Sequence, residues 1–312
     1  MKWIYRSSLL LSCAIVLVSL SNLHPAELPD APQPRSRREI ESILAKTRKI
    51  NPPDGFNPTK VVLVADVKDH GPGEHDYPLW QERWKNLLSG EGPVNLHGPP
   101  RDVPKAETGG ASIKVMTAMG WPNREQFALA DAVVVFCYIE WNDRKLNQLR
   151  EYLSRGGGFV LVHPANWTRP QPSDKVAALT GCGGFTQYRH GPVSLKIVDP
   201  DHPVCLGLGQ EIEFMDESYW PPTPRMNGSG MHVLATSNEK VMPASSEMRA
   251  QPMFWTREHG NGRVFGCVLG HYTWTFDDPY FRLLLLRGMA WVARQPVYRF
   301  DALAVLGINL KE

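Results

Sequence analysis

The sequence predicts an α/β domain in which helices flank a mainly parallel sheet, with additional strands in its C-terminal half. Three features support this prediction. Between residues 60 and 163, short apolar runs alternate with segments of helical periodicity, which is the pattern of βα units. Beyond residue 163, apolar runs follow one another with loops between them, as in a series of strands. A largely apolar segment over residues 278–293 then predicts a final helix that packs on the sheet.

The first half of the domain is expected to consist of βα units. Apolar runs predict strands at residues 61–67, 112–119, 132–138 and 158–163. Helical periodicity predicts helices near residues 79–88, 124–129 and 146–153, the last of which ends at consecutive glycines. The segment 90–110 is rich in glycine and proline and has no periodicity, so we interpret it as a surface loop.

The second half is expected to add strands to the same domain. Apolar runs predict them at residues 193–198, 211–214, 233–236, 253–257 and 264–269. The last two flank Asn261 and Gly262, a pair that is typical of a β-hairpin turn. Residues 59–296 are therefore predicted to form one domain rather than two, followed by a C-terminal tail over residues 297–312.

The N-terminus resembles a secretory signal peptide. Lys2 and Arg6 precede an apolar run over residues 9–20. This run is shorter than the roughly 20 residues that span a bilayer, and no later run without charges reaches that length, so we expect no membrane span in the mature chain. We assign residues 1–26 to the signal peptide and expect an exported protein, periplasmic or secreted.

A proline-rich segment over residues 27–58 predicts a linker between the signal peptide and the domain. Ile40, Ile43 and Leu44 form one short helical stripe within it. We therefore expect a linker that contains one short, exposed helix.

The charge balance excludes some classes of partner. The chain has 34 basic and 32 acidic residues, which leaves a net charge of +2. Such a balance provides no electrostatic footprint for nucleic acid or for an anionic membrane surface. We therefore expect no nucleic-acid partner, and a small, weakly charged ligand instead.

The cysteines that follow the predicted signal peptide fall into two pairs. Export permits disulfide bonds, so Cys182 and Cys205 could pair. Cys137 and Cys267 lie in apolar runs, where a free cysteine usually behaves as a small buried hydrophobic residue.

Histidines, acids and aromatic residues gather in several short segments, most of them directly after a predicted strand. Open α/β sheets place their ligand-binding loops at such positions. Imidazoles and carboxylates can move protons near neutral pH, and the rings of Trp and Tyr suit the apolar faces of sugars. The combination favours a carbohydrate site, formed by residues 69–78, 140–143, 163–167, 188–192, 216–220 and 270–277.

These segments provide the candidate site residues. The candidate catalytic residues are His163, His190 and His271, with Glu217 as their carboxylate partner. The candidate substrate-binding residues are His75, Asp76, Tyr77, Trp141, Arg189, Tyr219, Trp220, Tyr272 and Trp274. Strands of a parallel sheet end at one edge, so His75 and His163 should emerge there together. We expect His190, His271, Glu217 and Trp220 to join them in one cleft, on the hypothesis that their shared glycine, proline and aromatic surroundings mark one site. Each of these histidines taken alone is more typical of a packed, hydrogen-bonded core residue.

Two familiar catalytic arrangements are absent from the sequence. A nucleophile elbow needs glycines near the reactive residue, whereas Cys137 is flanked by Phe136 and Tyr138, and no Gly-x-Ser-x-Gly occurs. Glutamine amidotransferases of class I pair a cysteine with a His-x-Glu segment, which none of the 10 histidines forms.

A divalent metal stays an open alternative. His70, Glu74, His75 and Asp76 form a dense ligand-capable stretch, which the histidines of the later segments could join in space. No His-Glu-x-x-His or Cys-x-x-Cys occurs, so the spacing specifies neither a metal nor its ligands.

Several segments together resemble the ThuA-like family of trehalose utilisation: KVVLVA at residues 60–65, HGPGEHDYP at 70–78, HPA at 163–165, RHGP at 189–192 and LGHYTWTFDDP at 269–279. The resemblance implies a flavodoxin-type α/β fold, like that of class I glutamine amidotransferases, without their catalytic triad. It also implies a link to trehalose or related disaccharides, including oxidised keto sugars. Residues 138–143 depart from the family pattern, because they lack the histidine of its usual Trp-Asn-His-type segment.

Two classes of function follow from these observations. One is an enzyme that acts on a sugar or ketosugar by acid–base chemistry, with a metal-dependent hydrolase as a variant of it. The other is a carbohydrate-binding protein without catalytic activity. The two differ in whether Glu217 or Asp216 lies within hydrogen-bond reach of a cleft histidine, because a pure binder does not need a charge-coupled pair.

Overall fold

The structure is a computed structural model that describes residues 28–47, 58–103, 113–170, 172–224, 230–242 and 244–312. The chain divides into two compact units, Met1–Asp30 and Ala31–Glu312, and all helices and strands described below belong to the second. The expected signal peptide lies outside the described residues. No helix among the described residues is both long enough and apolar enough to cross a membrane.

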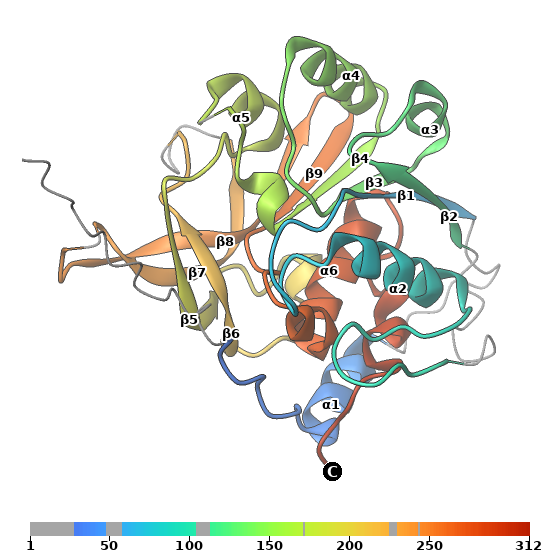
Figure 1. Cartoon of the computed structure of the whole chain (residues 1–312), viewed down its shortest axis with the longest axis vertical. Helices are drawn as coiled ribbons and strands as arrows, with labels where there is room; N and C mark the ends of the chain where they lie inside the picture. The colour runs from blue at the N-terminus through green and yellow to red at the C-terminus, as the bar shows by residue number, and fades with distance from the viewer. Residues whose placement is uncertain (1–27, 48–57, 104–112, 171, 225–229, 243) are drawn as a thin grey trace, which may run out of the picture. The chain divides into compact units, whose positions relative to one another are not determined.

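A mixed sheet organises the described part of the chain (Figure 1). Its strand order is β2-β1-β3-β4-β9-β8-β7-β5-β6. Strands β1 to β4 and β9 run parallel, whereas β9, β8, β7, β5 and β6 pair antiparallel in that order. The strands are β1 Thr59–Ala65, β2 Ile113–Met119, β3 Ala132–Val135, β4 Gly158–Val162, β5 Gln187–Ile197, β6 Glu211–Trp220, β7 His232–Lys240, β8 Met248–His259 and β9 Gly262–Cys267. The predicted fold class, a largely parallel sheet with additional C-terminal strands, is confirmed.

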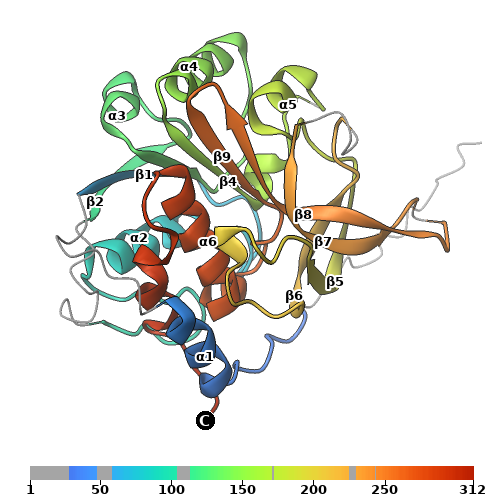
Figure 2. The same cartoon turned by 180° about the vertical axis from the view of Figure 1, so that it is seen from behind.

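Helices cover both faces of the parallel strands. Helices α2 and α6 lie on one face and α3 and α4 on the other, as the two opposite views show (Figures 1 and 2). The α-helices are α1 Arg37–Thr47, α2 Tyr77–Ser89, α3 Arg124–Leu129, α4 Asp143–Ser154, α5 Asp174–Thr180 and α6 Pro279–Val292. Shorter 3-10 turns are η2 His163–Asn166, η3 Pro203–Cys205, η5 Thr273–Asp277 and η6 Val297–Val305.

Local sequence explains where the helix next to the site begins and ends. The Asp76 side chain accepts a hydrogen bond from the main-chain N–H of Leu79 and so caps α2, and Pro78 occupies its first turn. Gly90 ends the helix in a left-handed conformation with φ of 77°. Helix α2 therefore begins directly after the loop that follows β1.

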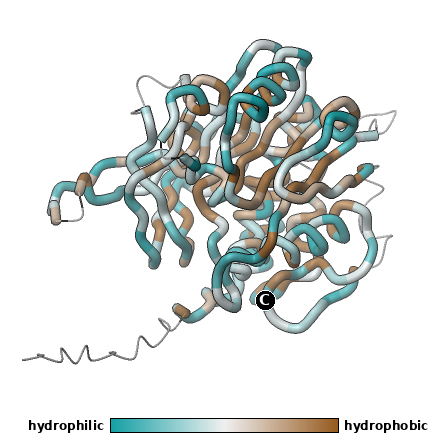
Figure 3. Tube along the Cα trace, turned by 45° about the horizontal axis from the view of Figure 1, so that its top comes forward, coloured by the Kyte–Doolittle hydropathy of each residue, from teal (hydrophilic) through white to brown (hydrophobic). Residues whose placement is uncertain are grey.

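The apolar core lies at the parallel strands and at α6. The segments coloured as most hydrophobic concentrate in the interior, whereas hydrophilic segments lie at the periphery (Figure 3). Helix α6 is buried on almost all sides, including two arginines. Arg282 pairs with Asp277 at 2.7 Å and Arg287 pairs with Asp301 at 2.9 Å, which compensates the burial of their charges.

The structure differs from the sequence-based expectations in four places. Helix α1 is not exposed, because Ile40, Ile43 and Leu44 pack into the core. Strands β5 and β6 are far longer than their apolar runs, so the polar segments 188–192 and 216–220 lie within strands rather than after them. Helix α5 was missed. Residues 297–305, assigned to the C-terminal tail, form η6, and Phe300 and Leu303 are buried there.

The cysteines are free in the structure. Cys137, Cys182, Cys205 and Cys267 are all buried and unpaired, so the suggested bond between Cys182 and Cys205 is absent. Burial raises the pKa of the Cys137 thiol to about 12, which is the behaviour expected of a structural cysteine.

Candidate functional site: a buried three-histidine and glutamate cluster

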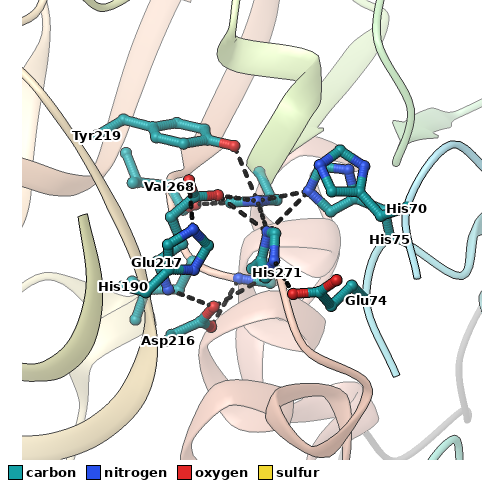
Figure 4. A network of polar contacts seen from close by, with 12 residues as sticks. His70, Glu74, His75, His190, Asp216, Glu217, Tyr219, Val268 and His271 are labelled. Carbon is teal, nitrogen blue, oxygen red and sulfur yellow. Dashed lines mark hydrogen bonds and ion pairs between the residues drawn. The ribbon is translucent and has the colours of Figure 1, made fainter. Parts of the chain in front are cut away.

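Three imidazoles and one carboxylate meet at the carboxyl edge of the parallel strands (Figure 4). His75 Nε2 lies 3.0 Å from both His163 Nε2 and His271 Nδ1, and the latter two atoms are 3.2 Å apart. Glu217 Oε2 lies 3.1 Å from His163 Nε2 and 2.9 Å from His271 Nδ1. At most 5% of any of these four residues is exposed. The polar atoms therefore share one small, enclosed space.

The parallel strands bring His75 and His163 to this edge. His163 directly follows β4, and His75 lies in the loop after β1. Both residues adopt the left-handed region, with φ of 48° and 39°, and Arg294 is the other non-glycine residue with positive φ in the described part of the chain. This conformation costs on the order of 1–3 kcal/mol for a residue with a side chain. The surrounding structure thus holds both histidines at an energetic cost.

Asp216 positions the other two members of the cluster. Its buried carboxylate accepts hydrogen bonds from the main-chain N–H groups of Glu217 at 2.7 Å, Gly270 at 2.8 Å and His271 at 2.9 Å. Gly270 has φ of 126°, and a Cβ there would lie 3.3 Å from the Cβ of His163. Strand β6 and the segment after β9 are thereby fixed to each other with their site residues side by side.

Two imidazoles have their outer nitrogens engaged by acceptors. His163 Nδ1 lies 2.6 Å from the carbonyl oxygen of Val268, which can only accept, so this nitrogen carries the proton. His271 Nε2 lies 3.1 Å from Glu74 Oε1, which likewise favours a proton on that nitrogen. In the neutral rings, the nitrogens that face the cluster then carry lone pairs.

The third imidazole follows the same pattern. His75 Nδ1 lies 3.2 Å from Asp69 Oδ1 and 2.8 Å from the hydroxyl of Tyr77, which itself donates to Asp69 Oδ2 at 3.0 Å. A proton on Nδ1 satisfies Asp69 and leaves the lone pair of Nε2 directed at the cluster. All three imidazoles therefore present acceptors to one point.

Burial and charge shift the pKa values of the cluster in different directions. Burial lowers the pKa of His75 to about 2, so this ring stays neutral. Burial alone would raise the pKa of Glu217, but the close approach of the His163 and His271 imidazoles holds it well below its ordinary value. Burial would lower the pKa of His271, but the carboxylates of Glu217 and Asp216 raise it above its ordinary value. The cluster thus contains an ionised carboxylate beside imidazoles.

A pocket of about 320 Å³ opens above the cluster. His190 extends into it from β5, where it is paired in register with Glu217 of β6, and its Nε2 lies 3.5 Å from Glu217 Oε1. About 42% of the His190 side chain is exposed, and its Nδ1 lies 3.0 Å from the Tyr272 hydroxyl. The lining comprises His70, Glu74, Tyr138, Trp167, Tyr188, His190, Glu217, Tyr219 and His271.

Most of the residues expected to converge do so. The structure brings together His75, His163, His190, His271 and Glu217, and it places the Tyr219 hydroxyl 2.8 Å from His163 Nε2. Trp220 does not join them, since its indole N–H donates to the carbonyl of Lys240 at 2.7 Å. Side chains alternate between the faces of a strand, so Glu217 and Tyr219 face the pocket and Trp220 faces away.

The remaining candidate binding residues lie outside the pocket lining. Arg189 alternates with His190 along β5 and pairs with Glu239 at 2.6 Å. Trp141 packs against Trp121, with ring centroids 5.6 Å apart. Two further aromatic residues, Tyr272 and Trp274, stack on each other at 4.2 Å behind His190. Asp76 caps α2, and Tyr77 contacts the outer side of His75.

Sequence reasoning overlooked several residues of the site. Asp69 and Tyr188 stood inside segments that were singled out, yet no role was assigned to them, and Glu74 was considered only as a metal ligand. The sequence did not indicate the positioning role of Asp216, because an acid next to Glu217 in a strand does not reveal which main-chain N–H groups its carboxylate will accept. Trp167 was signalled by its place in the segment after β4, where it now forms part of the pocket wall.

Comparison with known proteins agrees with this architecture. The chain is similar to a solved ThuA-like protein from Bacteroides uniformis, with 18% identity, a TM-score of 0.56, and coverage of 78% of this chain and 95% of that one. It is also similar to one from Parabacteroides merdae, with 21% identity, a TM-score of 0.54, and coverage of 76% and 90%. At these identities the likeness shows the fold alone. No curated protein matches the sequence.

A family model provides the stronger assignment. The model of ThuA, described as trehalose utilisation, matches residues 108–292. This range contains β2 to β9 and all of α6, and with them His163, Glu217 and His271. Because it spans more than half of the chain, the protein belongs to the ThuA family.

Proposed function

We propose that this protein is an enzyme that acts on a trehalose-type disaccharide or an oxidised keto derivative of one, by proton transfer in the pocket above the cluster. The observation that carries the proposal is the position of Glu217. Its carboxylate lies within 3.1 Å of His163 and His271 and 3.5 Å from His190. A protein that only binds sugar does not need a buried, charge-coupled set of this kind.

The pocket lining supports a sugar ligand. Trp167, Tyr188, Tyr138 and Tyr219 line it and provide aromatic faces, while His70, Glu74 and His190 provide polar groups for hydroxyls. Its volume of about 320 Å³ falls within the range of roughly 300–1,000 Å³ that is typical of small-molecule sites. The substrate class itself comes from the description of the family, trehalose utilisation.

His190 is the residue best placed to exchange protons with a bound sugar. Its ring is partly exposed in the pocket, whereas His75, His163 and His271 are almost fully buried. Glu217 lies close enough to stabilise a positive charge on His190 when the ring accepts a proton. We therefore assign His190 as the proton-transfer group and Glu217 as its charged partner.

Turnover of defined sugars tests this function. The purified protein is incubated with trehalose, with 3-keto-trehalose and with maltose, and products are followed by mass spectrometry. We expect turnover of at least one of the first two sugars, and a loss of about 100-fold or more in kcat for His190→Ala, in line with general acid–base catalysis. The matched control is His232→Ala, which removes an exposed histidine on β7 that pairs with Asp199.

The same experiment separates an enzyme from a binder. Saturable binding of these sugars by the wild-type protein, weakened in Trp167→Ala and accompanied by no chemical change, would replace the proposed enzyme with a carbohydrate-binding protein. Equal kcat in wild-type protein and His190→Ala would refute the role of His190.

A further inference from the structure

We propose that His75, His163, His271 and Glu217 form a mononuclear binding site for a divalent first-row transition-metal ion. The ligand atoms are His75 Nε2, His163 Nε2, His271 Nδ1 and Glu217 Oε2. Three imidazoles and a single carboxylate favour such an ion over Mg²⁺ or Ca²⁺, which prefer sites built from oxygen. The inference rests on geometry and hydrogen bonding, and it deepens the proposed function, since it concerns the floor of the same pocket.

The first argument is the direction of the lone pairs. Val268 O, Asp69 and Glu74 accept hydrogen bonds from the outer ring N–H groups, so the three nitrogens that face one another are acceptors in the neutral rings. Acceptors 3.0–3.2 Å apart repel one another, and Glu217 adds a negatively charged oxygen. A cation at the centre offsets this repulsion, because each of the four ligand atoms is attracted to it.

The second argument is the spacing of the ligand atoms. Five of the six pairs are 2.9–3.2 Å apart, and all four atoms lie within 4.8 Å of one another. No ion pair joins His75 to Glu217 among the contacts of these described residues, so this pair is the widest. Adjacent corners of an octahedron with bonds of about 2.1 Å are about 3.0 Å apart, and opposite corners about 4.2 Å. A tetrahedron would need six equal separations of about 3.3 Å.

The third argument is the support around the ligands. Metal-bound histidines characteristically donate their other N–H to a carboxylate or carbonyl, and here each of the three does so. His75 and His163 are held in left-handed backbone conformations that the loop and strand end would not adopt without a constraint. The carboxylates of Asp69, Glu74 and Glu217 provide negative charge that balances a divalent ion.

The arrangement also indicates how a sugar would meet the ion. With the four ligands at octahedral corners, two neighbouring corners stay open. Glu217 and His271 also line the pocket, so an ion held by the four ligands would lie at the pocket floor, within reach of a bound ligand. If the proposed function holds, a vicinal pair of sugar oxygens, such as the ketone and neighbouring hydroxyl of a keto sugar, has the spacing to occupy both. Tyr219 and His190 flank this position.

Metal binding is measured on the purified full chain after treatment with a chelator. The protein is dialysed against Mn²⁺, Co²⁺, Ni²⁺ or Zn²⁺, and the bound metal is quantified by mass spectrometry. We expect a single ion per chain for at least one of these metals, and a weak visible spectrum for the Co²⁺ form, as six-coordinate Co²⁺ gives. Retention of a single ion by the wild-type protein would support the site, and failure of all four metals to bind would overturn it.

Three variants locate the ion. Glu217→Gln removes the carboxylate charge without changing its shape, and we expect a loss of metal affinity of about 100-fold or more. Asp69→Asn leaves all four ligands in place but weakens the support of His75, for which we expect a loss of about 10–100-fold. The control His232→Ala lies on β7 outside the cluster and should bind metal as the wild type does. Unchanged affinity in both Glu217→Gln and Asp69→Asn would overturn the site.

Sugar turnover is scored separately, so that the two proposals fail separately. Metal binding by the wild-type protein without turnover of any sugar would leave the metal site standing and refute the proposed function. Sugar turnover by wild-type protein that binds none of the four metals would refute the metal site alone.

Discussion

Replacement of Asp216 by asparagine should disturb the site, because the Asp216 carboxylate holds two segments of the site together through hydrogen bonds from their main-chain N–H groups. Its carboxylate is completely buried and accepts three N–H groups, from Glu217, Gly270 and His271, at 2.7–2.9 Å. Oδ1 accepts the first and the third, and Oδ2 accepts that of Gly270. An amide of the same shape has only one oxygen, so at least one of these donors loses its acceptor.

These hydrogen bonds determine how much stability Asp216→Asn should lose. With the amide oxygen in place of Oδ1, the NH₂ group faces the N–H of Gly270, and leaving that buried donor unsatisfied costs about 1–3 kcal/mol. The other two hydrogen bonds change from charged to neutral acceptors, which weakens each by about 1 kcal/mol. Removal of a buried charge offsets part of this loss. We therefore expect Asp216→Asn to lower the free energy of unfolding by about 2–3 kcal/mol.

Urea unfolding followed by tryptophan fluorescence measures this change. Glu213→Gln is the matched control, because Glu213 is an exposed acid on the same strand, and surface changes of this kind usually stay within about 0.5 kcal/mol. Sugar turnover should fall in Asp216→Asn but not in the control, since Glu217 and His271 lose their common support. If Asp216→Asn unfolds within about 0.5 kcal/mol of the wild type, the three hydrogen bonds do not have the role assigned to them.

Three further predictions follow from the core and from the N-terminus. Cys137→Ala should lower the free energy of unfolding by about 1 kcal/mol and leave ligand binding intact, because the thiol is buried; loss of binding in a folded variant would contradict this. Gly266→Ala should cost more than about 2 kcal/mol in thermal unfolding, since its Cβ would lie 2.0 Å from the ring of Trp255, whereas Gly209→Ala, with its nearest neighbour at 3.8 Å, should be tolerated. We also propose that the protein is exported, so the intact mass of native protein should correspond to a start near Asn22 or Glu27, and a retained Met1 or a lipid on Cys13 would refute it.

The parallel half of the molecule was predictable because two physical rules act together. Continuous apolar runs between helical segments indicate buried parallel strands, and the predicted runs overlap β1 to β4. Chain direction then requires the residues after β1 and β4 to emerge at one edge of the sheet. The approach of His75 to His163 therefore followed from the sequence, although the 3.0 Å contact between their nitrogens did not.

The antiparallel half was less predictable for the reason that makes it part of the site. In β5 and β6, the residues that face the pocket are polar or aromatic, including His190, Glu217 and Tyr219. A strand that carries a polar pocket has no continuous apolar run, so the runs that were recognised covered only 193–198 and 211–214. The register that pairs His190 with Glu217 depends on the whole hairpin.

The cluster depends on folding of the whole domain rather than of one segment. His75 and His163 are separated by 88 residues, and His75 and His271 by 196, and Glu217 comes from the antiparallel half. No local stretch of the unfolded chain can bring these groups together, and the closure of such loops carries an entropic cost. A ligand that binds all four groups therefore binds only the folded chain, and its binding free energy adds to the stability of the entire sheet. The backbone strain at His75 and His163 is tolerated for the same reason, because packing on both halves of the sheet stabilises the site.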